Sequence, residues 1–215
     1  MPYSREHKTN SRERILSSAL RLFSEGGFER VTLDTVMADA GLTRGAFYAH
    51  FTSKEDLYAK AIHHGINNSA LAGIPPEGEN LRSLRQFIGG YLSRAHVEGK
   101  APPCPLAFFA TDVGVRERQV RDTYTAALQS LTGVLGTHAP ARTRDERLLA
   151  MTVLMVGGVA VSAALTDGAL KDRILASCRR TIMEMAETPL PRTRRQPTVR
   201  RAAARVTRPR RAQID

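Results

Sequence analysis

The sequence has few of the residues and motifs that mark several common protein classes. Of its 215 residues only two are cysteines, Cys104 and Cys178, and they lie far apart. This scarcity argues against a disulfide framework or a zinc site and favours a reducing, cytoplasmic setting. The N-terminal residues MPYSREHKTNSRER lack the apolar core of a secretory signal peptide, so we expect no export.

The sequence also lacks the common signatures of enzymes and of β-structure. It contains no G-x-S-x-G motif, no P-loop and no histidine–carboxylate cluster at catalytic spacing, so we do not expect an enzyme. No strand-type alternation of apolar and polar residues occurs. The apolar residues instead recur at helical spacing, which predicts an all-α fold, and a hydrophobic share of 42% is enough for a packed core.

Positive charge is abundant but unevenly distributed. The net charge is +11, yet residues 1–60 hold nine Lys and Arg against eight Asp and Glu, and residues 61–187 hold fourteen against twelve. Residues 188–215 hold nine Arg and one Asp. Bulk charge therefore says little about the folded part, and any nucleic-acid site there must be argued from the placement of individual groups.

The stretch VTLDTVMADAGLTRGAFYAHF, residues 31–51, predicts two short helices joined by a tight turn. Gly41 can adopt the left-handed backbone that ends one helix, and the Thr43 hydroxyl can cap the next. We expect Leu33, Val36, Ala40, Leu42, Phe47 and Phe51 to be buried, which leaves Thr43, Arg44, Gly45, Tyr48 and His50 outside. This pattern is a helix-turn-helix, whose second helix lies in the DNA major groove.

Four segments follow from the pattern of apolar, Pro and Gly residues. We expect a flexible basic arm over residues 1–9 and a DNA-binding domain over 10–60, with a first helix that starts at Asn10 or Ser11 and stops at Gly26 and Gly27. The pattern over residues 61–187 predicts a second helical domain. Within this range, the proline- and glycine-rich segment 72–80 is the best candidate for a boundary between domains. The arginine-rich composition of residues 188–215 predicts a disordered tail. This tail would either add salt-dependent affinity for DNA or act only as a solubilising extension.

Residues 148–165, LLAMTVLMVGGVAVSAAL, are almost wholly apolar. Their length is near the minimum for a membrane span, but the glycine pair and many alanines favour a helix packed on every side against other helices. We therefore expect no membrane association.

The motif VTLDTVMADAGLTRGAFYAHFTSKEDL, between Val31 and Leu57, resembles the signature of the TetR family of transcriptional regulators. Val36 and Met37 replace the usual isoleucine and alanine. The resemblance is strong over residues 10–60 and looser over 80–187. It implies a three-helix DNA-binding domain, a helical domain for effector binding and dimerisation, and release of DNA when a small molecule binds.

Residue roles follow from position in this motif. Arg44 and Gly45 resemble base-edge readers, and Thr32, Thr43, Tyr48, His50 and Lys54 resemble phosphate or sugar contacts. The chemistry agrees, because Arg44 is the side chain at the start of the second helix that can reach guanine O6 and N7 together. Tyr48 and His50 could also be an ordinary packed and an ordinary surface residue.

Candidate effector and sensor residues lie in the second domain. The resemblance places Phe87, Tyr91, Phe108, Phe109, Tyr124 and Met155 around an effector cavity, although an ordinary helical core would hold the same residues. Cys104 lies between prolines before a helix, where backbone amides could lower its pKa and make a reactive thiolate, or it could be a small buried hydrophobe. His63, His64 and His96 lack partners at metal-ligand spacing, so we expect no metal site and no cofactor.

Together these features predict a ligand-responsive repressor. It would bind a palindromic operator in double-stranded DNA as a homodimer through helices 148–165 and 169–187, and a small, largely apolar effector of unknown identity would release it. The alternatives are a repressor that senses electrophiles or oxidants through Cys104, an enzyme with an adventitious helix-turn-helix, and an architectural DNA-binding protein that acts through its tail.

Overall fold

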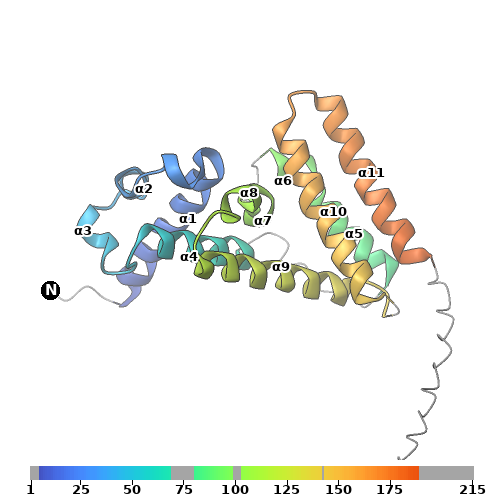
Figure 1. Cartoon of the computed structure of the whole chain (residues 1–215), viewed down its shortest axis with the longest axis horizontal. Helices are drawn as coiled ribbons and strands as arrows, with labels where there is room; N and C mark the ends of the chain where they lie inside the picture. The colour runs from blue at the N-terminus through green and yellow to red at the C-terminus, as the bar shows by residue number, and fades with distance from the viewer. Residues whose placement is uncertain (1–4, 69–79, 99–102, 142, 189–215) are drawn as a thin grey trace, which may run out of the picture.

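Helices form all the regular secondary structure in residues 5–68, 80–98, 103–141 and 143–188, the part of the chain that the computed structural model describes. The all-α prediction is confirmed (Figure 1). In chain order the helices are α1 (Arg5–Arg30), α2 (Leu33–Asp39), α3 (Arg44–Phe47), α4 (Lys54–Asn67), α5 (Leu81–Tyr91), α6 (Arg94–Val97), α7 (Pro105–Phe108), α8 (Ala110–Val113), α9 (Arg118–His138), α10 (Asp145–Ala164) and α11 (Gly168–Glu187).

The first helix differs from its predicted bounds at its start. It begins at Arg5 rather than at Asn10, since no proline or glycine interrupts residues 5–10. At its other end Gly27 takes a left-handed φ of 74°, and a last helical turn continues to Arg30. The regular helix is therefore interrupted at Gly27, as predicted, and a separate short turn follows it.

Helices α1 to α4 form a unit in which α1 packs along α4, while α2 and α3 lie at its outer end (Figure 1). Its core is apolar and aromatic: Ile15, Phe23, Phe47, Leu57 and Tyr58 are all at most 2% exposed. Burial of this many large side chains accounts for most of the stability of so small a unit.

Helix α9 connects the two ends of the molecule. It packs against α4 at one end and against α5 and α10 further along, where α5, α10 and α11 lie side by side (Figure 1). Pro105 occupies the first turn of α7. The start of α11 is capped by the Asp167 carboxylate, which accepts hydrogen bonds from the amides of Ala169 and Leu170.

Helix α10 is not buried on every side, contrary to the prediction. Leu149, Val153 and Val161 are 48%, 62% and 52% exposed, and their spacing of four and eight residues puts them on one face with Gly157. By length and composition α10 could cross a membrane, but 33% of its apolar 18-residue stretch is buried within the chain. An apolar helix face that the chain leaves exposed has the same sequence pattern as one covered by the chain's own core.

The arginine-rich tail lies outside the described residues beyond Thr188, as does most of the boundary at residues 72–80, of which only Asn80 is described. The division at residue 60 falls within α4, which continues to Asn67.

Candidate nucleic-acid interface

The first helix of the predicted pair, α2, is capped at both ends. Thr32 has an extended backbone, and its hydroxyl oxygen accepts a hydrogen bond from the Thr35 amide at 3.1 Å. At the other end Gly41 takes a φ of 63°, the amide of Leu42 donates to Met37 O at 2.9 Å, and the amide of Gly41 donates to Ala38 O at 3.0 Å. These two bonds form a Schellman motif, which confirms the predicted role of Gly41.

A side chain from α1 reinforces this turn. The Nη2 atom of Arg14 donates to the carbonyl of Ala40 at 2.5 Å, and a Cβ atom on residue 41 would lie 2.7 Å from the same nitrogen. Gly41 therefore meets two requirements, a left-handed backbone and a close approach by Arg14.

The second helix, α3, has one buried and one exposed side. Phe47 and Phe51 are at most 1% exposed, and their rings stack at 5.5 Å, as predicted for core residues. Thr43, Arg44 and Gly45 are exposed, and Tyr48 is 62% exposed. Leu33 and Leu42 are half-buried rather than buried, because both lie at the rim of this small core.

Thr43 lies at the N-cap of α3, but its hydroxyl makes no capping hydrogen bond, contrary to the prediction. The start of α3 therefore keeps backbone amides that could face an acceptor outside the chain. Thr43, Arg44 and Gly45 lie next to these amides.

Arg44 is paired within the DNA-free chain. Its Nη1 atom lies 3.2 Å from Oδ2 of Asp34 on α2, and both side chains are more than 60% exposed. An ion pair this exposed contributes about 0–1 kcal/mol, so a guanine can replace the carboxylate at little cost. The pair holds the guanidinium against the outer side of α2.

His50 and Lys54 are half-buried. The Lys54 ammonium lies 4.2 Å from the centroid of the Phe28 ring, in a cation–π contact. Lys54 begins α4, whose first turn is capped by Ser53 through a hydrogen bond from the Asp56 amide at 3.1 Å. Its charge is therefore held beside the first turn of α4, where a phosphate could also meet backbone amides.

Comparison with known proteins identifies this unit. Residues 15–61 match the family model described as "Bacterial regulatory proteins, tetR family". Residues 15–61 therefore form a TetR-type helix-turn-helix unit. The matched residues include all of the helix-turn-helix and the start of α4, and with them all seven predicted DNA-contacting residues, which lie in these helices or next to them.

Individual relatives agree with this assignment. The chain is 40% identical over 57 residues to the HTH-type transcriptional regulator AcrR of Shigella flexneri, and these residues are 26% of each chain. It is 30% identical over 56 residues to IcaR of Staphylococcus epidermidis, a "Biofilm operon icaADBC HTH-type negative transcriptional regulator", which is 26% of this chain and 30% of that one. The chain spans between about a quarter and less than half of the length of the curated relatives it matches.

The fold of the whole chain has solved counterparts. A TetR-family regulator from Agrobacterium tumefaciens superposes with a TM-score of 0.65 over 83% of this chain and 98% of its own, at 21% identity. This likeness concerns the fold and includes the α5–α11 part that the family model does not match.

Four of the six candidate effector residues lie in the interior of this TetR-type fold, and the other two lie at its edge. Phe87, Tyr91, Phe109 and Met155 are at most 1% exposed, whereas Phe108 and Tyr124 are half-buried. The Phe87 ring stacks on His138 at 4.6 Å, and the Tyr124 hydroxyl donates to the Leu106 carbonyl at 2.6 Å. An effector among these residues would have to displace existing contacts.

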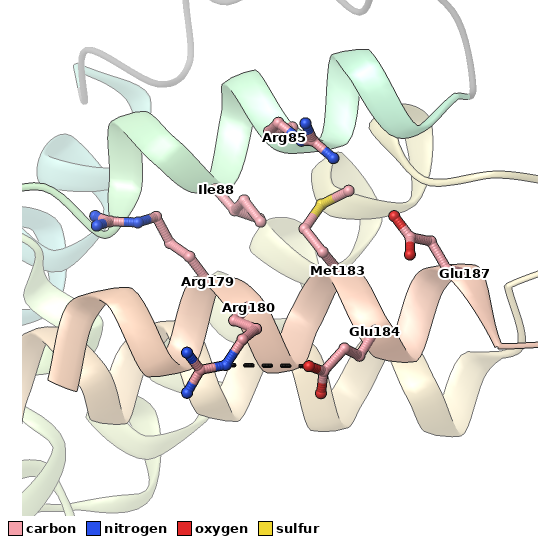
Figure 2. A pocket seen from close by; sticks show the side chains of 7 residues that line it. All are labelled: Arg85, Ile88, Arg179, Arg180, Met183, Glu184 and Glu187. Atoms are coloured by element: carbon pink, nitrogen blue, oxygen red, sulfur yellow. Dashed lines mark ion pairs between the residues drawn. The ribbon is translucent and has the colours of Figure 1, made fainter. Parts of the chain in front are cut away.

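A surface pocket of about 390 Å³ lies elsewhere, between α5 and α11 (Figure 2). None of the six candidates lines it; its walls are formed by Arg85, Ile88, Arg179, Arg180, Met183, Glu184 and Glu187. The Arg180 and Glu184 side chains face each other across one turn of α11 (Figure 2).

Cys104 is buried, and this opposes a role as a reactive thiolate. Burial raises the pKa of its thiol, while hydrogen bonds from Tyr91 and the nearby amides only partly offset this effect. Its sulfur lies 3.0 Å from the Tyr91 hydroxyl. The predicted influence of the amides is present, but burial is stronger.

No group of His, Cys, Asp and Glu that could hold a metal ion occurs among the residues the structure describes. His64 instead contacts the α1 side chains Glu13 and Ser17, and His96 Nδ1 donates a hydrogen bond to the Tyr91 carbonyl at 2.6 Å.

Asp34 was not predicted as part of the site. Ten residues separate it from Arg44, and only the turn at Gly41 brings the two side chains together.

Proposed function

We propose that this protein is a transcriptional repressor that binds a palindromic double-stranded DNA operator as a homodimer and is released by a small effector. The observation that carries the proposal is the exposed polar side of α3, presented by a capped helix-turn-helix that matches the TetR family model. Arg44 and Gly45 would face base edges. The remaining predicted residues would contact phosphates or sugars: Thr32, Thr43, Tyr48, His50 and Lys54.

The apolar outer face of α10 supports a dimer. Leu149, Val153 and Val161 expose about half or more of their surface on one side of a helix that is otherwise packed against α9 and α11. Covering this face with the same face of a second copy, together with α11, would form a four-helix bundle. A two-fold dimer reads two inverted half-sites, and the operator is therefore palindromic.

Repression and release are the finer parts of the proposal. The name of IcaR includes negative regulation, which supports repression here. The effector would bind among five aromatic residues and a methionine, and it would be largely apolar because these side chains offer few charges to an ion. The six residues are Phe87, Tyr91, Phe108, Phe109, Tyr124 and Met155.

Selection from random double-stranded DNA, followed by footprinting, tests the DNA-binding proposal. A discrete palindrome supports the repressor, diffuse and salt-sensitive protection favours an architectural protein that acts through its tail, and no protection refutes both. An in vitro transcription assay with the selected palindrome over the promoter then distinguishes repression from activation.

Dimerisation is tested by sedimentation. We expect Val153→Glu to convert the dimer to a monomer, because it places a charge in the proposed interface. Val115→Glu is the matched control, since Val115 is 77% exposed and lies between α8 and α9. Dimers that persist in Val153→Glu would contradict the proposed interface.

A further inference from the structure

The carboxylate of Asp112, on α8, lies where three segments of the chain meet. Its Oδ2 atom accepts hydrogen bonds from the backbone amide of Phe28 at 3.1 Å and from the Tyr58 hydroxyl at 2.8 Å. Its Oδ1 atom accepts one from Nη2 of Arg116 at 3.1 Å. A single side chain thus connects α8 to the end of α1 and to α4.

The bend in α1 explains why the Phe28 amide is available. The left-handed backbone of Gly27 interrupts the helical hydrogen-bond pattern, so the next amide needs another acceptor, and Asp112 supplies it. Arg116 also contacts this end of α1. Its guanidinium lies 4.4 Å from the centroid of the Phe28 ring, and its Nη1 atom is 2.5 Å from the Glu29 carboxylate.

The bond to Tyr58 is surrounded by aromatic rings. Tyr58 is 0% exposed, meets Phe23 and Phe28 edge-on at 4.9 and 5.1 Å, and stacks on Phe109 at 4.8 Å. A hydrogen bond to a carboxylate is strong and directional in such a setting, whereas ring contacts tolerate sliding.

We infer that Asp112 is a positioning residue that fixes the orientation of the α1–α4 unit and thereby the operator spacing that the dimer accepts. The inference rests on the proposed function. The two segments that Asp112 holds are those that flank the helix-turn-helix, because α2 follows the end of α1 and α4 follows α3. In a dimer, a rotation of each unit would change the separation of the two α3 helices.

Apolar packing alone would leave this orientation less defined. Helix α4 also packs against α7 and α9, and a Cβ on Gly65 would lie 3.1 Å from Pro105. These contacts attach the unit but are non-directional. The hydrogen bonds that Phe28 and Tyr58 donate to Asp112 set the angle of the α1–α4 unit.

The test uses the full chain and the palindrome selected with it. Duplexes with one base pair added or removed at the centre change the half-site separation by about 3.4 Å and the relative rotation by about 35°. We expect the unsubstituted protein to bind them at least about tenfold more weakly than the selected palindrome. For Asp112→Ala we expect this ratio to fall to about threefold or less.

Conservative variants separate positioning from folding. Tyr58→Phe keeps the ring contacts and removes one hydrogen bond, so we expect an intermediate ratio. Asp112→Asn keeps an oxygen acceptor for Phe28 and Tyr58 and should retain most of the discrimination. Asp122→Ala is the matched control, because it breaks an exposed pair with Arg118 that has the same four-residue spacing as the pair of Asp112 and Arg116.

The outcomes are distinguishable. An unchanged ratio in folded Asp112→Ala overturns the inference and leaves the proposed function intact. If Asp112→Ala does not fold, Tyr58→Phe decides, and a ratio equal to that of the unsubstituted protein overturns the inference. If selection yields no palindrome, the proposed function fails and the inference fails with it.

Discussion

Replacing Gly41 with alanine should destabilise the protein through backbone strain and the loss of one hydrogen bond at the turn. Gly41 has a φ of 63°, and a left-handed backbone costs an alanine about 1–2 kcal/mol. The new Cβ would also lie 2.7 Å from Nη2 of Arg14, which must move and lose its hydrogen bond to Ala40 O. That loss adds about 0.5–1.5 kcal/mol, which brings the expected total to about 1.5–3.5 kcal/mol.

Urea unfolding followed by circular dichroism measures this cost. In an Arg14→Ala background the hydrogen bond is already absent, so Gly41→Ala should cost only the backbone strain of about 1–2 kcal/mol. The difference between the two backgrounds is the coupling energy between residues 14 and 41.

Gly45→Ala is the control substitution. Its backbone is not left-handed, and the nearest atom to a Cβ there is Thr43 Oγ1 at 3.9 Å. We expect Gly45→Ala to leave stability unchanged or raise it by up to about 1 kcal/mol. Equal effects of Gly41→Ala and Gly45→Ala, or strict additivity with Arg14→Ala, would refute this account of the turn.

Three further predictions concern other groups. Arg44→Ala should cost about 1–3 kcal/mol at one base position of the operator, whereas Lys54→Ala should weaken binding to all sequences alike; a fluorescence-anisotropy panel of single-base variants would contradict this if both lost affinity uniformly. Burial lowers the pKa of His96 and of His138, so the unfolded chain takes up protons first as the pH falls below about 6.5. The free energy of unfolding from urea titrations should therefore decrease from about pH 6.5 toward the lowered pKa values. His138→Gln should make this decrease smaller, and an unchanged curve would exclude His138 as a source of the pH dependence. Cys104→Ser should leave DNA binding intact, and because burial raises the thiol pKa we expect quinones and aldehydes not to release the unsubstituted protein from DNA; release that Cys104→Ser abolishes would instead establish thiol sensing.

The local part of the structure could be predicted from sequence. The Gly41 turn, the burial of Phe47 and Phe51, and Pro105 at the start of a helix all depend on residues close together in the chain. Backbone preferences and helical periodicity act over such distances, so short motifs were sufficient.

Two kinds of feature could not be predicted in this way. One is pairing between distant residues, such as Asp112 with Phe28 and Tyr58, which depends on how helices pack. The other is competition between effects of opposite sign at one atom. At Cys104 both the helix N-terminus and burial act on the thiol pKa, and only the structure shows that burial dominates.

Gly157 and Gly158 serve opposite sides of α10. A Cβ on Gly158 would lie 2.9 Å from Leu92 and 3.1 Å from the sulfur of Cys178, whereas a Cβ on Gly157 would meet nothing within 4 Å. The first glycine of the pair therefore faces the outside, and the second sets how closely the chain's own helices approach. Because the two positions are adjacent but face opposite sides, a substitution at residue 157 would change the proposed dimer face without repacking the interior behind it.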